Sequence, residues 1–292
     1  MFATLLGPLP RPPLDDDAAP EALLDACLEL QADHGLEPAT DGGWGIAEDA
    51  VASWKETARR ADRLVKAVVV GPYSSGGQVA DARRVIDALA DAGCRWIEVH
   101  EPAAVSIGSD ADARARFADA HRTLTRDLGP DVHLSLAITG GDADAAGIDT
   151  ILAGAYSSLA VDLIDGPDNW RLAVAVPGER GVICGALSVH QGADDGPEVL
   201  VWAARYAAGS KGRGIARVGL ATSGSMADLP WEAAAEKVRR LSDATRIVVA
   251  SPEERRQALD PRAVDIRSAA LGRVEPLPKR KGHERREVAD ES

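Results

Sequence analysis

The chain has few cysteines and few aromatic residues. Three of its 292 residues are cysteine, Cys27, Cys94 and Cys184, and no two of them form a CxxC pair. Disulfide-rich domains and sulfur-type structural zinc sites need closely spaced cysteines, so the sequence argues against both classes. Aromatic residues make up only 4% of the chain, and we therefore expect an aliphatic core.

Long apolar runs and an excess of positive charge are also missing. No segment reaches the roughly 20 apolar residues of a membrane span, and the N-terminus MFATLLGPLPRPP lacks the pattern of a secretion signal. The 33 basic and 46 acidic residues give a net charge of −13, which repels nucleic acid and anionic membranes. We expect a cytoplasmic protein with a small-molecule substrate and no nucleic-acid or membrane partner, and its oligomeric state stays open.

Short apolar runs alternate with amphipathic stretches along the chain. The runs are bounded by Gly, Pro or Asp and are too short for independent helices, which predicts buried strands separated by helices. The eight runs are 3–7, 35–40, 64–71, 95–101, 132–138, 158–164, 181–189 and 217–222. The predicted helices include 78–92, 111–128, 197–208 and 231–244.

Eight strands alternating with helices predict one α/β domain, a (β/α)8 TIM barrel, over residues 1–271. A doubly wound open sheet is the alternative. Pro38 interrupts the second run and makes it the weakest strand. A ninth apolar run at 246–250 is either an accessory strand or the packing edge of a helix. Residues 272–292 are polar and of mixed charge, so we expect a disordered tail there.

Titratable and hydroxyl side chains gather at the predicted strand ends, which form the active face of a barrel. These residues are Tyr73, Ser74, His100, Glu101, His133, Ser135, Asp162, Ser188, His190 and Ser223. The glycine-containing segments 74–77 and 139–141 lack the full phosphate-binding fingerprint, and we interpret them as flexible strand-to-helix loops.

Several segments, in order along the chain, resemble the motifs of one known family. Residues 5–12 resemble its GS-x-PRP segment, 35–43 its GLD-x-x-TDGE strand and 70–72 its GP-x-T motif. IEVHEPA at 97–103 resembles IQIDEPA, HLS at 133–135 resembles H-x-C, 185–190 resembles G-x-x-D-x-H and 219–224 resembles PDCG. Over residues 3 to about 243 the chain thus resembles the C-terminal catalytic barrel of cobalamin-independent methionine synthase, a (β/α)8 fold shared with uroporphyrinogen decarboxylase.

The resemblance implies a zinc-dependent methyltransferase, but the ligand positions differ. In the family a His, two Cys and a Glu hold the zinc ion that binds the homocysteine thiolate. The matching positions here are His133, Ser135, Asp162 and Ser223. Because serine hydroxyls are poor zinc ligands, we expect no zinc of the family type. A metal site rebuilt from His133, Asp162 and either His100 or His190 is the alternative.

Two further departures concern the substrate. His100 replaces the Asp that contacts the homocysteine amino group in the family, and Gly43 replaces a Glu. Loss of both carboxylates predicts that the site no longer prefers an amino-acid thiol and could prefer an anionic ligand. Glu101 and His190 match retained positions, and we expect them to act as a general acid/base pair. We expect the substrate to be bound by His100, His133, Ser135, Asp162, Ser223, Tyr73 and Ser74.

The resemblance therefore implies a methyltransferase-type barrel enzyme that acts on a small acceptor other than homocysteine, with a folate or corrinoid as its methyl donor. Two alternatives stay open. One is a metal-free lyase, decarboxylase or isomerase of a small acid, in which His100 and His133 bind anionic groups. The other is a barrel that binds a ligand without catalysis.

Overall fold

The strands form one parallel sheet that curls into a half-barrel. The computed structural model describes residues 1–193 and 196–260. Its strands are β1 (Phe2–Thr4), β2 (Ala67–Val70), β3 (Trp96–His100), β4 (His133–Ile138), β5 (Ser158–Asp162), β6 (Gly181–Leu187) and β7 (Val218–Thr222). Their order is β1-β7-β6-β5-β4-β3-β2, with every pairing parallel. The first strand pairs with the last, and the order never reverses at a central strand, which excludes the doubly wound alternative.

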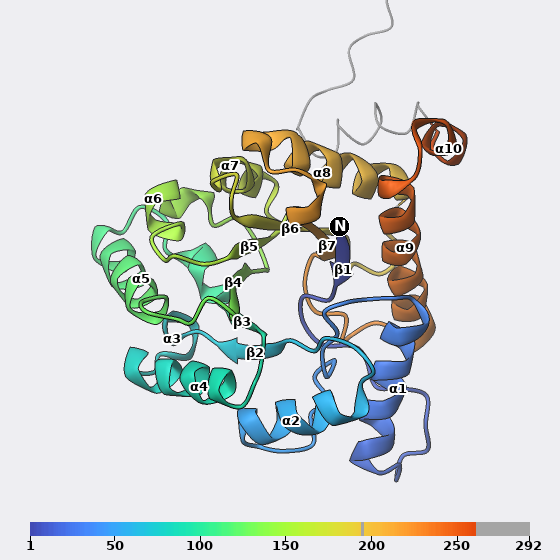
Figure 1. Ribbon diagram of the computed structural model, residues 1–292, viewed down its shortest axis with the longest axis horizontal. Coiled ribbons are helices and arrows are strands. Elements are labelled where there is room, and N and C mark those ends of the chain that lie inside the picture. The colour runs from blue at the N-terminus through green and yellow to red at the C-terminus, as the bar shows by residue number, and fades with distance from the viewer. Residues whose placement is uncertain (194–195, 261–292) are drawn as a thin grey trace, which may run out of the picture.

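Helices surround this sheet on its outer side (Figure 1). They are α1 (Pro20–Asp33), α2 (Ala50–Arg60), α3 (Pro72–Ser75), α4 (Val79–Asp91), α5 (Ala111–Leu124), α6 (Ile148–Ile151), α7 (Trp170–Ala175), α8 (Pro197–Gly209), α9 (Trp231–Val249) and α10 (Pro252–Ala258). The four predicted helices correspond to α4, α5, α8 and α9. The ninth apolar run is the last turn of α9, and its residue 250 caps that helix.

The predicted strand at 35–40 is the part of the barrel that the structure corrects. This segment forms no strand, because Pro38 has no N–H to give to a ladder. Its backbone still lies between the two edges of the sheet: Glu37 N donates to Ala3 O over 2.9 Å, and Ala39 N donates to Leu64 O over 2.8 Å. The described residues therefore contain a seven-stranded curled sheet and not the predicted eight-stranded one. The expected tail at 272–292 lies outside the described residues.

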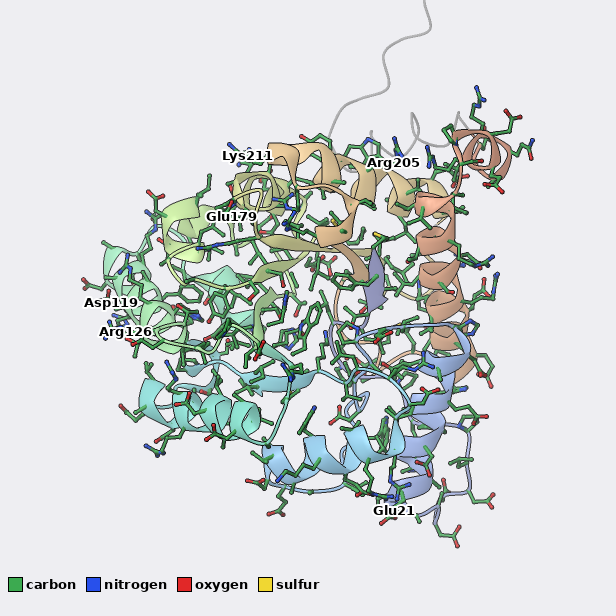
Figure 2. The ribbon with its side chains drawn as sticks, viewed as in Figure 1. Glu21, Asp119, Arg126, Glu179, Arg205 and Lys211 are labelled. Carbon is green, nitrogen blue, oxygen red and sulfur yellow. The ribbon has the colours of Figure 1, made fainter. Side chains whose placement is uncertain are left out.

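Two apolar layers hold the fold together. The larger one lies between the sheet and the helices and contains aliphatic side chains such as Ile86, Ile97 and Leu136. The smaller one fills the concave side with Leu6, Ala137, Ala160, Ile183 and Ala221, whose mostly small side chains suit a tightly curved sheet. The charged side chains that Figure 2 labels, from Glu21 to Lys211, lie on the outer surface.

Aromatic rings fill the concave side at the amino ends of the strands. Phe2 packs edge-on against Trp96 with ring centroids 5.3 Å apart, and Trp96 lies against His133 at 3.8 Å. Gly219 makes room for Phe2, since a Cβ there would come within 2.4 Å of the ring. The amino end of the half-barrel is therefore packed with side chains, and its carboxyl end is left for a site.

Candidate active site

His190 and Asp165 form a polar pair at the carboxyl edge of the sheet. Asp165 lies in the loop after β5 and His190 in the loop after β6. Asp165 Oδ1 is 2.7 Å from His190 Nε2, and the two side chains are 40% and 59% exposed. Ser188 Oγ accepts the backbone N–H of His190 over 3.1 Å and fixes the start of its loop. A proton on Nε2 directed at Asp165 leaves the lone pair of the imidazole on Nδ1, which is the arrangement of a general base.

Asp162 holds the loops around this pair. Its Oδ1 accepts the N–H groups of Ile164 and Asp165 over 2.8 and 3.0 Å, and its Oδ2 accepts that of Gly140 over 3.1 Å. The side chain is almost fully buried, and this burial raises the pKa of its carboxyl group. Asp162 therefore lies at the predicted strand end, where it shapes the loop that carries Asp165.

Asn169 also holds these loops in place, and no sequence motif predicts this role. Its Nδ2 donates to Asp162 O over 2.8 Å and to Gly141 O over 2.9 Å, while its Oδ1 accepts Ala143 N over 2.8 Å. The loops after β4 and β5 are thus tied together by one buried amide. Such a side chain leaves no signal in the sequence, because its partners are backbone groups far along the chain.

His100 lies on the concave face at the end of β3. Its Nε2 is 3.4 Å from Thr139 Oγ1. Burial lowers the pKa of His100, with opposing contributions from Glu98, which raises it, and Lys66, which lowers it. The imidazole is therefore neutral near pH 7. This does not favour the prediction that it binds an anion.

A buried ion pair lies beneath His100. Lys66 Nζ is 2.8 Å from Glu98 Oε2 and donates to Leu5 O over 2.7 Å, with both side chains 1% exposed or less. Glu98 Oε1 has no hydrogen-bond partner among the described residues. Both residues lie in predicted strands, but the sequence does not predict either of them as a site residue. Only the fold brings positions 66 and 98 together.

Glu101 departs most from its predicted role. It is fully buried, and its oxygens accept the N–H groups of Tyr73 and Ser74 at the start of α3 over 3.1 and 2.7 Å. Its Oε1 also lies 3.2 Å from Nε2 of His121 in α5. Because the side chains of a strand alternate, His100 faces the concave side and Glu101 follows on the helix side. The structure does not bring Glu101 and His190 together as an acid/base pair.

Tyr73 and Ser74 share the surroundings of Glu101. The ring of Tyr73 packs edge-on against Phe117 of α5, with centroids 5.6 Å apart. Ser74 Oγ accepts the N–H of Ala103 over 3.0 Å. Both side chains are thus held on the helix side, where they stabilise α3. Their binding of a substrate stays a prediction.

His133 and Ser135 lie elsewhere than expected. His133 is the first residue of β4, at the opposite end of the strand from the carboxyl edge, which corrects its predicted position. Its Nε2 is 2.9 Å from Ser158 Oγ, and burial lowers its pKa to about 4. Ser135 lies in the middle of the strand and accepts the indole N–H of Trp96 over 3.2 Å. Both side chains belong to the packed amino half of the sheet.

Ser223 follows β7 at the carboxyl edge, as predicted. The residue is 1% exposed, and its Oγ has no hydrogen-bond partner among the described residues. Its backbone N–H donates to Leu187 O over 2.7 Å, which joins the ends of β7 and β6. Its binding of a substrate stays a prediction.

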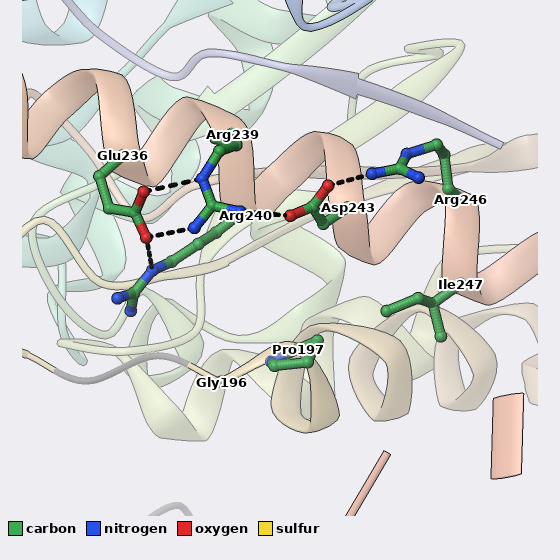
Figure 3. A pocket seen from close by; sticks show the side chains of 8 residues that line it. All are labelled: Gly196, Pro197, Glu236, Arg239, Arg240, Asp243, Arg246 and Ile247. Atoms are coloured by element: carbon green, nitrogen blue, oxygen red, sulfur yellow. Dashed lines mark hydrogen bonds and ion pairs between the residues drawn. The ribbon is translucent and has the colours of Figure 1, made fainter. Parts of the chain in front are cut away.

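A groove lies between the start of α8 and α9 (Figure 3). Its volume is about 430 Å³, and it is lined by arginine side chains of α9. Glu236 pairs with Arg239 and Arg240, and Asp243 pairs with Arg239 and Arg246. The pKa of Glu236 falls to about 2 because Arg239 and Arg240 hydrogen-bond its carboxylate. These neutralised pairs are typical of a solvated helix face.

Comparison with known proteins agrees with the sequence motifs. No family model matches the chain. A curated 5-methyltetrahydropteroyltriglutamate–homocysteine methyltransferase of Rhodopseudomonas palustris is 31% identical over 187 residues, which cover 56% of this chain and 22% of that protein. Over this stretch the chain is similar to the methionine synthase C-terminal barrel family. It spans about a fifth of the curated relative.

Two solved structures support the fold of this methionine synthase-like barrel. A B12-independent methionine synthase of Shewanella sp. W3-18-1, in complex with selenomethionine, aligns with a TM-score of 0.70 and 14% identity over 88% of this chain and 99% of that one. A B12-independent methionine synthase from Listeria monocytogenes, described as putative, aligns with a TM-score of 0.67 and 13% identity over 86% and 98%. At this identity the similarity shows the fold alone.

The positions that the motif resemblance matched to the family's zinc ligands do not all lie together in the structure. His133 starts β4 and Ser223 follows β7, so opposite ends of the parallel sheet separate them, a distance of roughly 15 Å for a strand of this length. The concave positions at the carboxyl end of β4 hold Ala137 and Thr139. Among the described residues, no three His, Cys, Asp or Glu side chains converge on a point where a metal ion could bind.

No helix of the described residues combines the length and apolarity that crossing a membrane requires.

Proposed function

We propose that this chain is a methyltransferase-type enzyme that acts on a small polar acceptor other than homocysteine, without a zinc ion of the family type. The carrying observation is the pair of His190 and Asp165 at the carboxyl edge, 2.7 Å apart. It supplies a proton acceptor where a thiol-activating metal site would otherwise be needed. Similarity to the curated methyltransferase supports the methyl-transfer chemistry.

In this proposal His190 activates the acceptor. Nδ1 of His190 takes the proton of an O–H or N–H group as the acceptor attacks the methyl carbon, and the donor leaves with the electron pair of its bond to that carbon. Asp165 stabilises the imidazolium that forms and holds the ring in one orientation. Asp162 keeps the Asp165 loop in place through its three backbone hydrogen bonds.

The protonation state of the three cysteines supports a methyl transfer that does not use a zinc-bound cysteine thiolate. Cys27, Cys94 and Cys184 are all buried. Burial raises the pKa of Cys27 and of Cys184 to about 12, so both stay protonated near pH 7. The chain offers no cysteine thiolate to hold zinc at the carboxyl edge.

The histidines favour this proposal over the lyase alternative. That alternative needs His100 and His133 to bind anionic groups as cations. Burial lowers the pKa of both, for His133 to about 4, so neither carries a charge near pH 7. The methyl donor in the proposal is a methylated folate of the kind named in the curated relative, with a methylcorrinoid as the second choice.

The test follows a labelled methyl group. The full-length protein is incubated with ¹³C-methyltetrahydrofolate or ¹³C-methylcobalamin and a pool of small alcohols, amines and acids, and NMR reports where the label goes. We expect transfer to an acceptor other than homocysteine, reduced about 100-fold or more by His190→Gln and about tenfold by Asp165→Asn. Asp168→Asn, a nearby acid 3.6 Å from Arg171, is the control and keeps full activity. Stoichiometric zinc together with methylation of homocysteine contradicts the proposal.

A further inference from the structure

Val68 and Val70 are apolar side chains left open on the concave side of the sheet. In β2, Ala67 and Val69 face the helices and are buried, whereas Val68 is 44% exposed and Val70 is 57% exposed. A strand of a curled sheet normally buries both of its faces. The exposure of this one face therefore needs an explanation.

The register of the sheet places both valines beside polar residues of β3. Val68 is paired with Glu98 of β3, and Val70 with His100. Because paired residues of neighbouring strands face the same side, Val70 stands next to the imidazole on the concave side. Val70 is also the last residue of β2, so it shares the carboxyl edge of the sheet with the loops of Asp165 and His190, with β3 and β4 between β2 and β5 in the strand order.

The groups around the two valines carry no net charge. Below them the ammonium of Lys66 is neutralised by Glu98 at 2.8 Å. Beside Val70, burial keeps His100 neutral near pH 7 by lowering its pKa. The charged groups of the edge, Asp165 and His190, come instead from the loops after β5 and β6. The edge thus has an uncharged apolar side and a polar side.

We propose that Val68 and Val70 form the apolar wall of the substrate site, and that the substrate carries an uncharged aliphatic or aromatic portion next to the polar group that reacts. This inference rests on the proposed function, because it takes the carboxyl edge as the place of reaction. An apolar wall at this place implies that the methyl acceptor is an amphipathic small molecule, and it excludes a small, uniformly charged acid as the acceptor.

Other exposed aliphatic residues do not share this setting. Ile148 is 42% exposed at the start of α6, and Val249 is 61% exposed in the last turn of α9. Both lie on outer helices, where single exposed aliphatic side chains are ordinary. The two valines of β2 differ because they are neighbours on one concave face, beside titratable groups.

The experiment replaces each valine by threonine, which keeps the shape and the strand preference and exchanges a methyl for a hydroxyl group. The probe is the aromatic dye 1-anilinonaphthalene-8-sulfonate, whose fluorescence reports apolar contact. We expect about threefold weaker dye binding for Val68→Thr or Val70→Thr and about tenfold for the double variant. Val249→Thr is the matched control and leaves binding unchanged.

Three outcomes overturn the inference: equal dye binding by the wild type and the double variant, equal weakening by Val249→Thr, or a shift from dimer to monomer in the double variant by gel filtration. The last result would make the wall an interface between copies of the chain. Because dye binding needs no turnover, failure here is distinct from failure of the proposed methyl transfer. Once an acceptor is known, the valine variants should raise KM and leave kcat unchanged.

Discussion

Glu101 and His121 form a buried contact on the helix side of β3, with Oε1 and Nε2 3.2 Å apart and neither side chain exposed. The Nδ1 of His121 in turn lies 2.5 Å from the hydroxyl oxygen of Tyr156. These contacts between Glu101, His121 and Tyr156 connect the end of β3, α5 and the segment before β5. Glu101 therefore acts in the architecture that supports the carboxyl edge.

Glu101→Gln should lower the stability of the protein. A glutamine has one acceptor oxygen, whereas Glu101 accepts two backbone N–H groups at the start of α3. We expect the free energy of unfolding in urea to fall by about 2 kcal/mol, with activity kept in the folded fraction. Gly71→Ala should have a similar effect, since its Cβ would lie 2.0 Å from Glu101 Oε1. Gly129→Ala, where an added methyl meets open space, is the control. Unchanged stability with lost turnover would restore a catalytic role to Glu101.

The Lys66–Glu98 pair should show strong coupling in a double-mutant cycle. Lys66→Met leaves the Glu98 carboxylate buried without its cation, and we expect a loss of about 3–5 kcal/mol in urea unfolding. The double variant Lys66→Met, Glu98→Leu removes both charges and should recover most of that loss. Additive effects of the two single substitutions would mean that the two charges do not interact.

Stability should depend on the charge state of His133. Its pKa is about 4 in the folded protein against an ordinary value of 6.5, so between these values the unfolded chain binds the proton and the folded chain does not. Stability should therefore fall as the pH is lowered from 6.5 to 4, by about 2 kcal/mol for this group. His133→Phe should flatten the slope in urea unfolding measured across this range. Ser158→Ala removes only the hydrogen bond to Nε2 of His133, and this variant should keep most of the dependence of stability on pH. An unchanged slope in His133→Phe contradicts the prediction.

Ser223→Ala should separate stability from function. The hydroxyl is buried without a partner among the described residues, so its removal should raise the free energy of unfolding by about 0.5–1 kcal/mol. If the hydroxyl serves the substrate, the same variant should raise KM about three- to tenfold. Thermal unfolding and steady-state kinetics measure the two effects. A clear loss of stability would instead show that Ser223 makes a structural hydrogen bond.

Much of the fold could be predicted because its strands are short apolar runs ended by glycine, proline or aspartate. The pattern fails at 35–40, where Pro38 leaves a strand-like sequence without the N–H that a ladder needs. The helices were predictable where apolar residues recur at helical spacing, as in α4 and α9. The curl of the sheet follows from strand order, which only the assembled structure reveals.

The candidate site could be predicted less completely. Asp162 and His190 lie at strand ends, where the sequence places them. Glu101, also predicted for the active face, is buried on the helix side, since strand alternation puts it on the opposite side from His100. The apolar run 132–138 already places His133 near the beginning of a strand, whereas the resemblance to the H-x-C motif implied a position at the carboxyl end. The partnership of Asp165 with His190 depends on loop conformation, which the sequence alone does not determine.

The ring-filled amino end of the half-barrel has a kinetic consequence. Phe2, Trp96 and His133 occupy the space through which a small molecule would otherwise pass. For the two-substrate methyl transfer proposed above, donor and acceptor would both enter and leave at the carboxyl end. We therefore expect a compulsory order of addition, in which the molecule that binds deeper arrives first.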